Sequence, residues 1–457
     1  MLGAAGPEAA PGPIAAAEWM DCGDGFECAS LRVPLDHGHP EGRGLDLALI
    51  RRPAGDPARR IGPLVLNPGG PGASGVRHLR ESVDRLDPAL LERFDVVSFD
   101  PRGIGGSGGL DCQDDLERWL SADPTPDDEV EWAALAGAAR ALARGCGEQA
   151  PHLLPHLGTL DVARDLELLR RALGARRLSY LGVSYGTLLG AAYADLHPER
   201  VRAFVLDAAI APGLSLAEFT LQQSRALERA FVRPTELAAV EQRIERSPIR
   251  AANGRRSAGP ADLALALAGS LYAPRRGQAA LERALRQALD GDGSGLVDLA
   301  DAYLEVRADG SYPNSFEANL AVTCLDLAAP RGLEAWRARA SEIARAAPLF
   351  GLANWNWALP CAFWSADPAP LQMLSAAGAA PILIVGRTRD PVTPFAWAEA
   401  LASALDSGVL LPVEGGGHAS SQRGNECVAA VIRDYLIDLR LPQVETSSSP
   451  RRLRACR

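Results

Sequence analysis

The stretch LGVSYG at residues 181–186 decides how this chain folds. Residues 178–183 form a short apolar run of strand-forming residues, and residues 185–196 read as a helix that ends before Pro198. A serine on so tight a strand-to-helix turn is forced into a strained conformation, and the flanking glycines leave room for it. The hydroxyl of Ser184 is then exposed beside the positive end of the helix dipole, which predicts a nucleophile. The alternative is a glycine-rich turn whose serine merely caps the helix.

Length and composition indicate a large globular protein. A chain of 457 residues favours one large domain with an insertion, or two domains. The net charge of -10, with no basic run before the tail RRLR, argues against nucleic acid or anionic membranes as partners. No stretch approaches the apolar length of a membrane-spanning helix. Residues 1–21 are rich in Ala, Pro and Gly without the features of a signal peptide, and we expect them to be disordered.

The eight cysteines point to an oxidising compartment. None lies in a metal-binding pattern, and they fall into near pairs along the chain. Eight cysteines allow 105 connectivities, and eight free thiols in a reducing cytosol are the alternative. We predict a secreted protein with the sequential disulfides Cys22–Cys28, Cys112–Cys146, Cys324–Cys361 and Cys427–Cys456.

The first half of the chain alternates strands and helices. Residues 29–35 and 45–51 read as two antiparallel strands, and residues 63–66 as a buried strand that ends in the rigid loop NPGGPG. A further strand at residues 94–99 precedes DPRGIGGS. This loop has no phosphate-binding fingerprint, so a nucleotide site is excluded. A polar helical excursion over residues 110–148 follows, and then a helix at 160–173.

This rhythm predicts a mostly parallel sheet with helices on both faces, interrupted by a helical cap. From residue 214 to 368 we find helices without a credible strand, and the tryptophans at 355 and 357 and Phe363 either belong to the core or line a pocket there. Strands at 381–385 and 409–413 and helices at 395–405 and 427–439 complete the sheet. The expected divisions are 1–21, 22–212 (core, first part), 213–372 (cap) and 373–457 (core, second part).

Three residues that follow predicted strands form a catalytic constellation. Ser184, Asp390 and His418 occur in the order that the α/β-hydrolase fold requires, and strand ends in a parallel sheet share one edge. His418 would take the serine proton and return it to the leaving group, while Asp390 fixes the imidazole tautomer. Asp207 is a rival for the acid, because it ends the strand after the nucleophile helix. Glu414 reads as a surface turn residue.

Two backbone N–H groups are expected to hold the oxyanion. They are the N–H of Tyr185, directly after the nucleophile, and that of Gly70 in the NPGGPG loop. No metal-ligand spacing is present, so we expect neither a metal nor a cofactor.

With these motifs, the chain resembles the secreted tripeptidyl aminopeptidase group of the proline-iminopeptidase-like α/β-hydrolases, peptidase family S33. The matching stretches are NPGGPG (67–72), DPRGIG (100–105), GVSYG (182–186), DPVTP (390–394) and GGH (416–418). The resemblance implies a secreted, monomeric enzyme that removes tripeptides or single residues from free N-termini. Its relatives carry HGGPG where this chain has PGGPG, which fits the tripeptidyl branch and makes proline-only specificity less expected.

Recognition of a free N-terminus requires a carboxylate for the ammonium group in a water-poor pocket. Asp326 is the first candidate, followed by Glu218 and Glu317, although each also reads as an ordinary helix-face acid. An esterase with the same triad is the alternative function. A binding protein on a dead hydrolase fold is disfavoured by the intact triad. Epoxide hydrolases and dehalogenases are excluded because they need an aspartate at position 184.

Overall fold

The computed structural model describes residues 16–112, 115–252, 254, 256–272, 274–372, 374–421, 425–445 and 450–457. Most of the N-terminal segment expected to be disordered therefore lies outside the described residues. Within the described part, no helix combines the length and the apolar character needed to cross a membrane.

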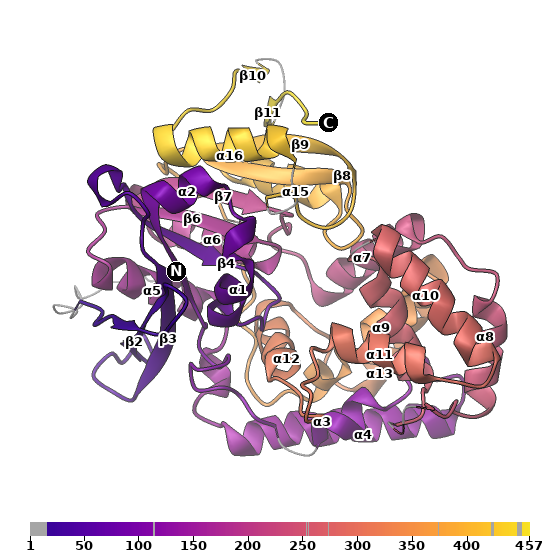
Figure 1. The fold of residues 1–457 in the computed structure, drawn as a ribbon. Coiled ribbons are helices and arrows are strands. Elements are labelled where there is room, and N and C mark those ends of the chain that lie inside the picture. Colours follow the sequence, from indigo (N-terminus) through magenta and orange to yellow (C-terminus); the bar gives the residue numbers. More distant parts are fainter. Residues whose placement is uncertain are drawn as a thin grey trace, which may run out of the picture.

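One twisted sheet forms the centre of the molecule (Figure 1). Its strand order is β1-β2-β3-β5-β4-β6-β7-β8-β9-β11-β10, and β4 to β9 run parallel to their neighbours within that group. The antiparallel pair predicted at the start of the chain is β2 and β3. The strands are β1 (Met20–Asp21), β2 (Glu27–Pro34), β3 (Gly44–Arg52), β4 (Gly62–Asn67), β5 (Phe94–Phe99), β6 (Leu178–Val183), β7 (Val201–Asp207), β8 (Ile382–Arg389), β9 (Gly408–Gly416), β10 (Val444–Glu445) and β11 (Arg451–Leu453).

Helices cover both faces of the sheet. Successive side chains of a strand point to opposite faces, and the buried strands carry apolar residues on both, so each face needs a covering layer. Tyr180 and Phe204 belong to the apolar cluster on the face of α5 (Thr159–Ala172), α6 (Tyr185–Leu196) and α15 (Phe395–Ala404). Leu181 and Val205, one residue further along, belong to the cluster on the other face. That face is covered by α1 (Gly75–Ser82), α2 (Pro88–Arg93) and α16 (Glu426–Asp438). This is the predicted α/β-hydrolase architecture.

The chain between β7 and β8 forms a helical cap, as the sequence predicts. Its helices are α7 (Leu216–Ala230), α8 (Leu237–Arg246), α9 (Pro260–Ser270), α10 (Pro274–Leu289), α11 (Ser294–Tyr303), α12 (Ser315–Asp326), α13 (Leu333–Ala346) and α14 (Gly351–Asn356). Among the described residues of this segment, the β pairing amounts to an isolated bridge between Ile249 and Ala258.

The excursion over residues 110–148 packs into this helical layer. Its helices are α3 (Asp115–Leu120) and α4 (Glu129–Gln149), which run along the cap in Figure 1. Trp119 and Leu142 share one buried apolar cluster with Leu320 and Trp336 of the cap. The division predicted from the sequence assigns residues 110–148 to the hydrolase core. The sequence pattern does not reveal that they pack on the cap, because their cap partners are more than a hundred residues away in the chain.

The loop DPRGIGGS has a structural role. The buried guanidinium group of Arg102 donates two hydrogen bonds of 2.7 Å to the carboxylate of Asp165 on α5. It also donates to the carbonyl oxygens of Pro34 and Leu35. The loop therefore ties β2 to α5.

Four disulfides join the pairs of cysteines that the sequence predicts. Cys112–Cys146 closes the excursion onto α4, and Cys324–Cys361 fastens α12 to the short 3-10 helix Leu359–Phe363. Cys427–Cys456 links α16 to the C-terminal tail. No cysteine is free.

Candidate active site

Ser184 stands at the turn between β6 and α6 in a conformation that few non-glycine residues adopt. Its φ is 56° and its ψ is -123°. A side chain at position 182 would collide with the carbonyl oxygen of Gly186, and one at 186 would collide with Asn67. The Ser184 side chain makes no capping hydrogen bond to α6. The capping alternative is therefore wrong.

Asp390 and His418 form a buried hydrogen-bonded pair at the ends of β8 and β9. The imidazole Nδ1 lies 3.1 Å from each carboxylate oxygen of Asp390. Oδ1 of Asp390 also accepts the N–H groups of Val392 at 2.9 Å and Thr393 at 3.0 Å. These bonds fix the carboxylate, so a proton on Nδ1 leaves Nε2 of His418 as a base.

The register of the sheet brings Ser184 and this pair to the same edge. Val183 is paired with Asp207, Asp207 with Val385, and Arg389 with Gly416, so β6 to β9 end side by side. Reactive groups at one carboxyl edge of a parallel sheet are the arrangement expected for a hydrolase of this architecture.

Asp207, the rival acid, binds backbone rather than imidazole. Its Oδ2 accepts the N–H groups of Ser420 at 2.7 Å and Ser421 at 2.6 Å, just after His418. Burial raises the pKa of its carboxyl. Glu414 is exposed and faces Arg457 at 3.9 Å.

Two N–H groups are available near Ser184 for a negatively charged oxygen. Tyr185 begins α6, where the first N–H groups have no partner within the helix. Gly70 has a φ of 105°, a region that favours glycine, and lines the same cavity as Ser184. The loop is held by the Asn67 side chain, whose Oδ1 accepts the N–H of Gly69 at 3.0 Å.

A cavity of about 660 Å³ lies between the sheet edge and the cap, and Ser184 lines it. The cap contributes side chains from α7, α9, α11 and α12, and the core contributes Gly70, Val392 and Thr393. Tyr272, also on the cavity wall, packs edge-on against the ring of His418 with centroids 5.6 Å apart. The cap therefore reaches the imidazole directly.

The carboxylates predicted to bind a substrate ammonium lie elsewhere. Asp326 accepts two hydrogen bonds from Thr159, and burial raises the pKa of its carboxyl to about 7. Glu317 accepts the N–H of Cys112 at 2.7 Å, and burial raises its pKa to about 7 as well. Glu218 caps α7 through Ser215, and those hydrogen bonds lower its pKa. The structure places none of the three on the cavity wall.

Glu305 is the residue that sequence reasoning missed. It follows α11 with a φ of 57° and is the charged side chain among the described residues that line the cavity. Its Oε2 pairs with the guanidinium group of Arg77 on α1. Of the cap aromatics, Trp357 lines the cavity, whereas Trp355 stacks on Trp336 in the core with centroids 4.0 Å apart. Phe363 lies against Arg140.

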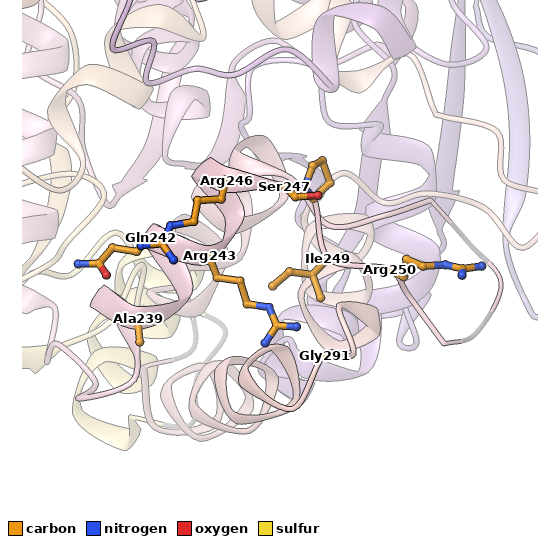
Figure 2. A pocket seen from close by; sticks show the side chains of 9 residues that line it. Ala239, Gln242, Arg243, Arg246, Ser247, Ile249, Arg250 and Gly291 are labelled. Carbon is orange, nitrogen blue, oxygen red and sulfur yellow. The ribbon is translucent and has the colours of Figure 1, made fainter.

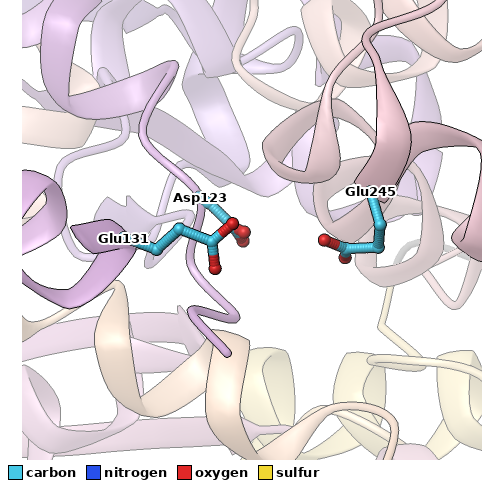
Figure 3. A group of neighbouring side chains, drawn as sticks. All are labelled: Asp123, Glu131 and Glu245. Atoms are coloured by element: carbon cyan, nitrogen blue, oxygen red, sulfur yellow. The ribbon is translucent and has the colours of Figure 1, made fainter. Parts of the chain in front are cut away.

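Two polar features of the helical layer lie apart from the cavity. A surface hollow of about 650 Å³ is lined by three arginines of the α8 region, and in Figure 2 the guanidinium group of Arg250 points away from those of Arg243 and Arg246. Figure 3 shows Asp123 and Glu131 facing Glu245. A carboxylate oxygen of each of the three lies within 4.8 Å of those of the other two. Burial, followed by repulsion from Asp123 and Glu131, raises the pKa of Glu245 to about 7.

A profile described as "alpha/beta hydrolase fold" matches residues 62–244, and one described as "TAP-like protein" matches residues 347–448. The chain is 33% identical to the serine protease Hip1 of Mycobacterium tuberculosis over 92% of this chain and 88% of that protein.

Two further relatives carry different activities in their names. The tripeptidyl aminopeptidase of Streptomyces lividans is 31% identical over 95% of this chain and 86% of that protein. Carboxylesterase B of Mycobacterium tuberculosis is 32% identical over 93% of this chain and 86% of that protein. These similarities extend over nearly the whole sequence and agree with the architecture. The chain therefore belongs to the TAP-like α/β-hydrolases of peptidase family S33.

Proposed function

We propose that this hydrolase is a secreted serine exopeptidase that releases tripeptides or shorter units from free N-termini. The observation that carries the proposal is the buried Asp390–His418 pair at the sheet edge that also presents the strained Ser184. The proposed catalytic residues are Ser184, His418 and Asp390, and the proposed oxyanion donors are the N–H groups of Gly70 and Tyr185.

The reaction proceeds through an acyl-enzyme. His418 Nε2 takes the proton of Ser184 as Oγ attacks the carbonyl carbon, and Asp390 stabilises the imidazolium ion. The two N–H groups hold the resulting oxyanion. Collapse of the tetrahedral intermediate breaks the C–N bond, and the imidazolium returns the proton to the departing amine. Water, deprotonated by His418, then attacks the acyl-enzyme and releases the acid and Ser184.

Exopeptidase specificity requires a group that recognises the substrate ammonium, and Glu305 is the proposed residue. A carboxylate has two oxygens that each accept hydrogen bonds, so pairing of Oε2 with Arg77 leaves Oε1 for a second cation. The wall of the cavity is otherwise formed by apolar and neutral polar side chains of the described residues. A cap-covered cavity with one acid suits a short chain end better than the middle of a polypeptide.

Secretion is part of the proposal and rests on the cysteines. Four disulfides persist in oxidising compartments and are rare in a reducing cytosol. We propose that the enzyme acts as a monomer on peptides with free N-termini, and that neither nucleic acid nor a membrane is a partner. The second candidate function is an esterase, which the name of one relative favours and which would use the same triad.

The test is a substrate panel with the purified full chain. It contains a tripeptide p-nitroanilide with a free amine, its N-acetyl derivative and p-nitrophenyl esters of short acids. We expect kcat/KM for the free peptide to exceed that for the acetylated one by about 2–5-fold, because the ammonium would pair with a carboxylate that is half-exposed. Ser184→Ala should lose several orders of magnitude with every substrate. Equal cleavage of the blocked peptide would reject the exopeptidase, and turnover of esters alone would establish the esterase.

A further inference from the structure

We propose that helix α12 of the cap acts as a brace for the oxyanion hole, with Asn319 and Asp326 as positioning residues. The inference rests on the proposed function, because it concerns the two N–H groups assigned to the oxyanion. One end of α12 contacts the loop that carries Gly70, and its other end is linked to the side chain of Tyr185.

The first contact is between α12 and the NPGGPG loop. Nδ2 of Asn319 donates to the carbonyl oxygen of Pro71 at 2.9 Å, one residue from Gly70. At Gly72 the loop approaches the backbone of α12 so closely that a side chain would collide with the carbonyl oxygen of Ser315. The position of this loop is therefore set by the helix as well as by the sheet.

The second contact runs through Thr159, the first residue of α5. Asp326, at the end of α12, accepts the N–H of Thr159 at 2.9 Å and its hydroxyl at 2.5 Å. The Thr159 hydroxyl is in turn hydrogen-bonded to the phenol oxygen of Tyr185. All three side chains are buried. The chain of hydrogen bonds thus ends on the residue whose N–H is the other oxyanion donor.

The helix is itself held firmly. Cys324 near its C-terminal end is joined to Cys361, and Glu317 in its first turn accepts the N–H of Cys112. The same helix presents Asn319 and Thr323 to the cavity. One helix therefore links the cavity wall to both oxyanion donors. Catalysis depends on donors placed within a fraction of an ångström, so loosening either contact should slow the chemical step more than it weakens binding.

The experiment compares Asn319→Ala and Asp326→Ala with a matched control, Asn356→Ala. Asn356 Nδ2 also donates to a proline carbonyl at 2.9 Å, that of Pro124, but in the core of the helical layer. The readouts are kcat, KM and the inhibition constant of a peptide boronic acid, whose tetrahedral adduct on Ser184 mimics the transition state.

We expect kcat to fall about 10–100-fold in both brace variants, which is a smaller loss than complete removal of an oxyanion donor causes. KM should stay within about threefold of the wild-type value. The boronate inhibition constant should rise in parallel with the loss of kcat/KM, which a general loss of stability would not produce. Folded Asn356→Ala should keep the wild-type kcat and inhibition constant. If Asp326→Ala does not fold, Tyr185→Phe removes the hydrogen bond to Thr159 and preserves the ring.

The results separate the brace from the proposed function. Suppose that the wild-type enzyme cleaves its substrate and binds the boronate. If the folded brace variants then have the same kcat and inhibition constant as the wild type, the brace alone is overturned. A wild-type enzyme that neither turns over any acyl substrate nor binds the boronate would overturn the proposed function and the brace with it.

Discussion

The backbone N–H of Ser184 donates to the carbonyl oxygen of Asp207 at 2.9 Å. The carboxylate of the same aspartate accepts the N–H groups of Ser420 and Ser421, so Asp207 connects the nucleophile turn to the loop that carries His418. Asp390 instead makes its hydrogen bond to the imidazole. The two acids at adjacent strand ends therefore have different roles. Asp207 binds backbone N–H groups, and Asp390 orients the imidazole of His418.

This division predicts different consequences for the same substitution. Asp390→Asn should lower kcat by about 10³–10⁴-fold, because the amide favours the wrong imidazole tautomer. Asp207→Asn should keep kcat within about tenfold, because an amide oxygen still accepts the two N–H groups. Steady-state kinetics on the best substrate, with thermal unfolding to verify the fold, measures both. The reverse ranking would make Asp207 the catalytic acid.

The buried acids at the two ends of α12 predict a pH-dependent stability. The pKa of Asp326 is raised from its ordinary value near 3.8 to about 7, chiefly by burial; the hydrogen bonds from Thr159 oppose this rise, and the charge of Asp161 adds to it. Because the folded state retains a proton that the unfolded state has lost, this group makes the free energy of unfolding fall as pH rises from about 4 to about 7. Glu317 acts in the same direction, because burial and, to a smaller extent, the charge of Asp111 raise its pKa.

The measurement is urea unfolding of the wild type and of Glu317→Gln and Asp326→Asn between pH 4.5 and 8. Each amide variant should gain stability relative to the wild type as pH rises, and the difference should level off above about pH 7. A difference that is constant over this range would show that the two carboxyls titrate normally in the folded protein.

The sequence predicts most of the sheet and the edge at which the candidate site lies. Each strand is a short apolar run, and Ser184, Asp390 and His418 follow such runs directly, so local pattern and strand direction are sufficient. The same reasoning places the loop of Gly70 beside them. These features depend on residues that are neighbours in the chain or on a fixed parallel order.

The residues that line the cavity cannot be predicted from these local patterns. Glu305 follows α11 in a left-handed conformation, and nothing in the neighbouring sequence predicts that it lines the same cavity as Ser184. Asp326 is predicted to bind the substrate ammonium, but in the fold it binds Thr159, which is 167 residues away in the chain. Which helix faces meet across a cap depends on tertiary packing, which periodicity within a helix does not encode.

The disulfides predict an order of stabilisation. Cys112 and Cys146 are separated by 34 residues and are fully buried, whereas Cys22 and Cys28 are separated by 6. A longer closed loop restricts the unfolded chain more, so replacing the first pair with alanine should cost about 2–4 kcal/mol and replacing the second pair less. Urea unfolding of the two double variants measures both costs. An equal or larger cost for the short loop would mean that local contacts, not loop closure, dominate.

The acid that recognises the substrate amine is tested by comparing Glu305→Gln with Glu218→Gln. Glu305 lines the cavity, whereas Glu218 caps α7 through Ser215 outside it, so the two variants remove the same charge from different places. Glu305→Gln should lower kcat/KM for the free tripeptide amide by about 2–5-fold and leave the N-acetyl peptide unaffected, because only the free peptide carries the ammonium. Glu218→Gln should change neither.

Arg77→Gln supplies a further check: it removes the cation that pairs with Glu305, and so should maintain or improve the preference for the free amine. If Glu305→Gln instead slows both peptides equally, the side chain shapes the cavity without recognising charge, and the ammonium must be bound by backbone carbonyl groups.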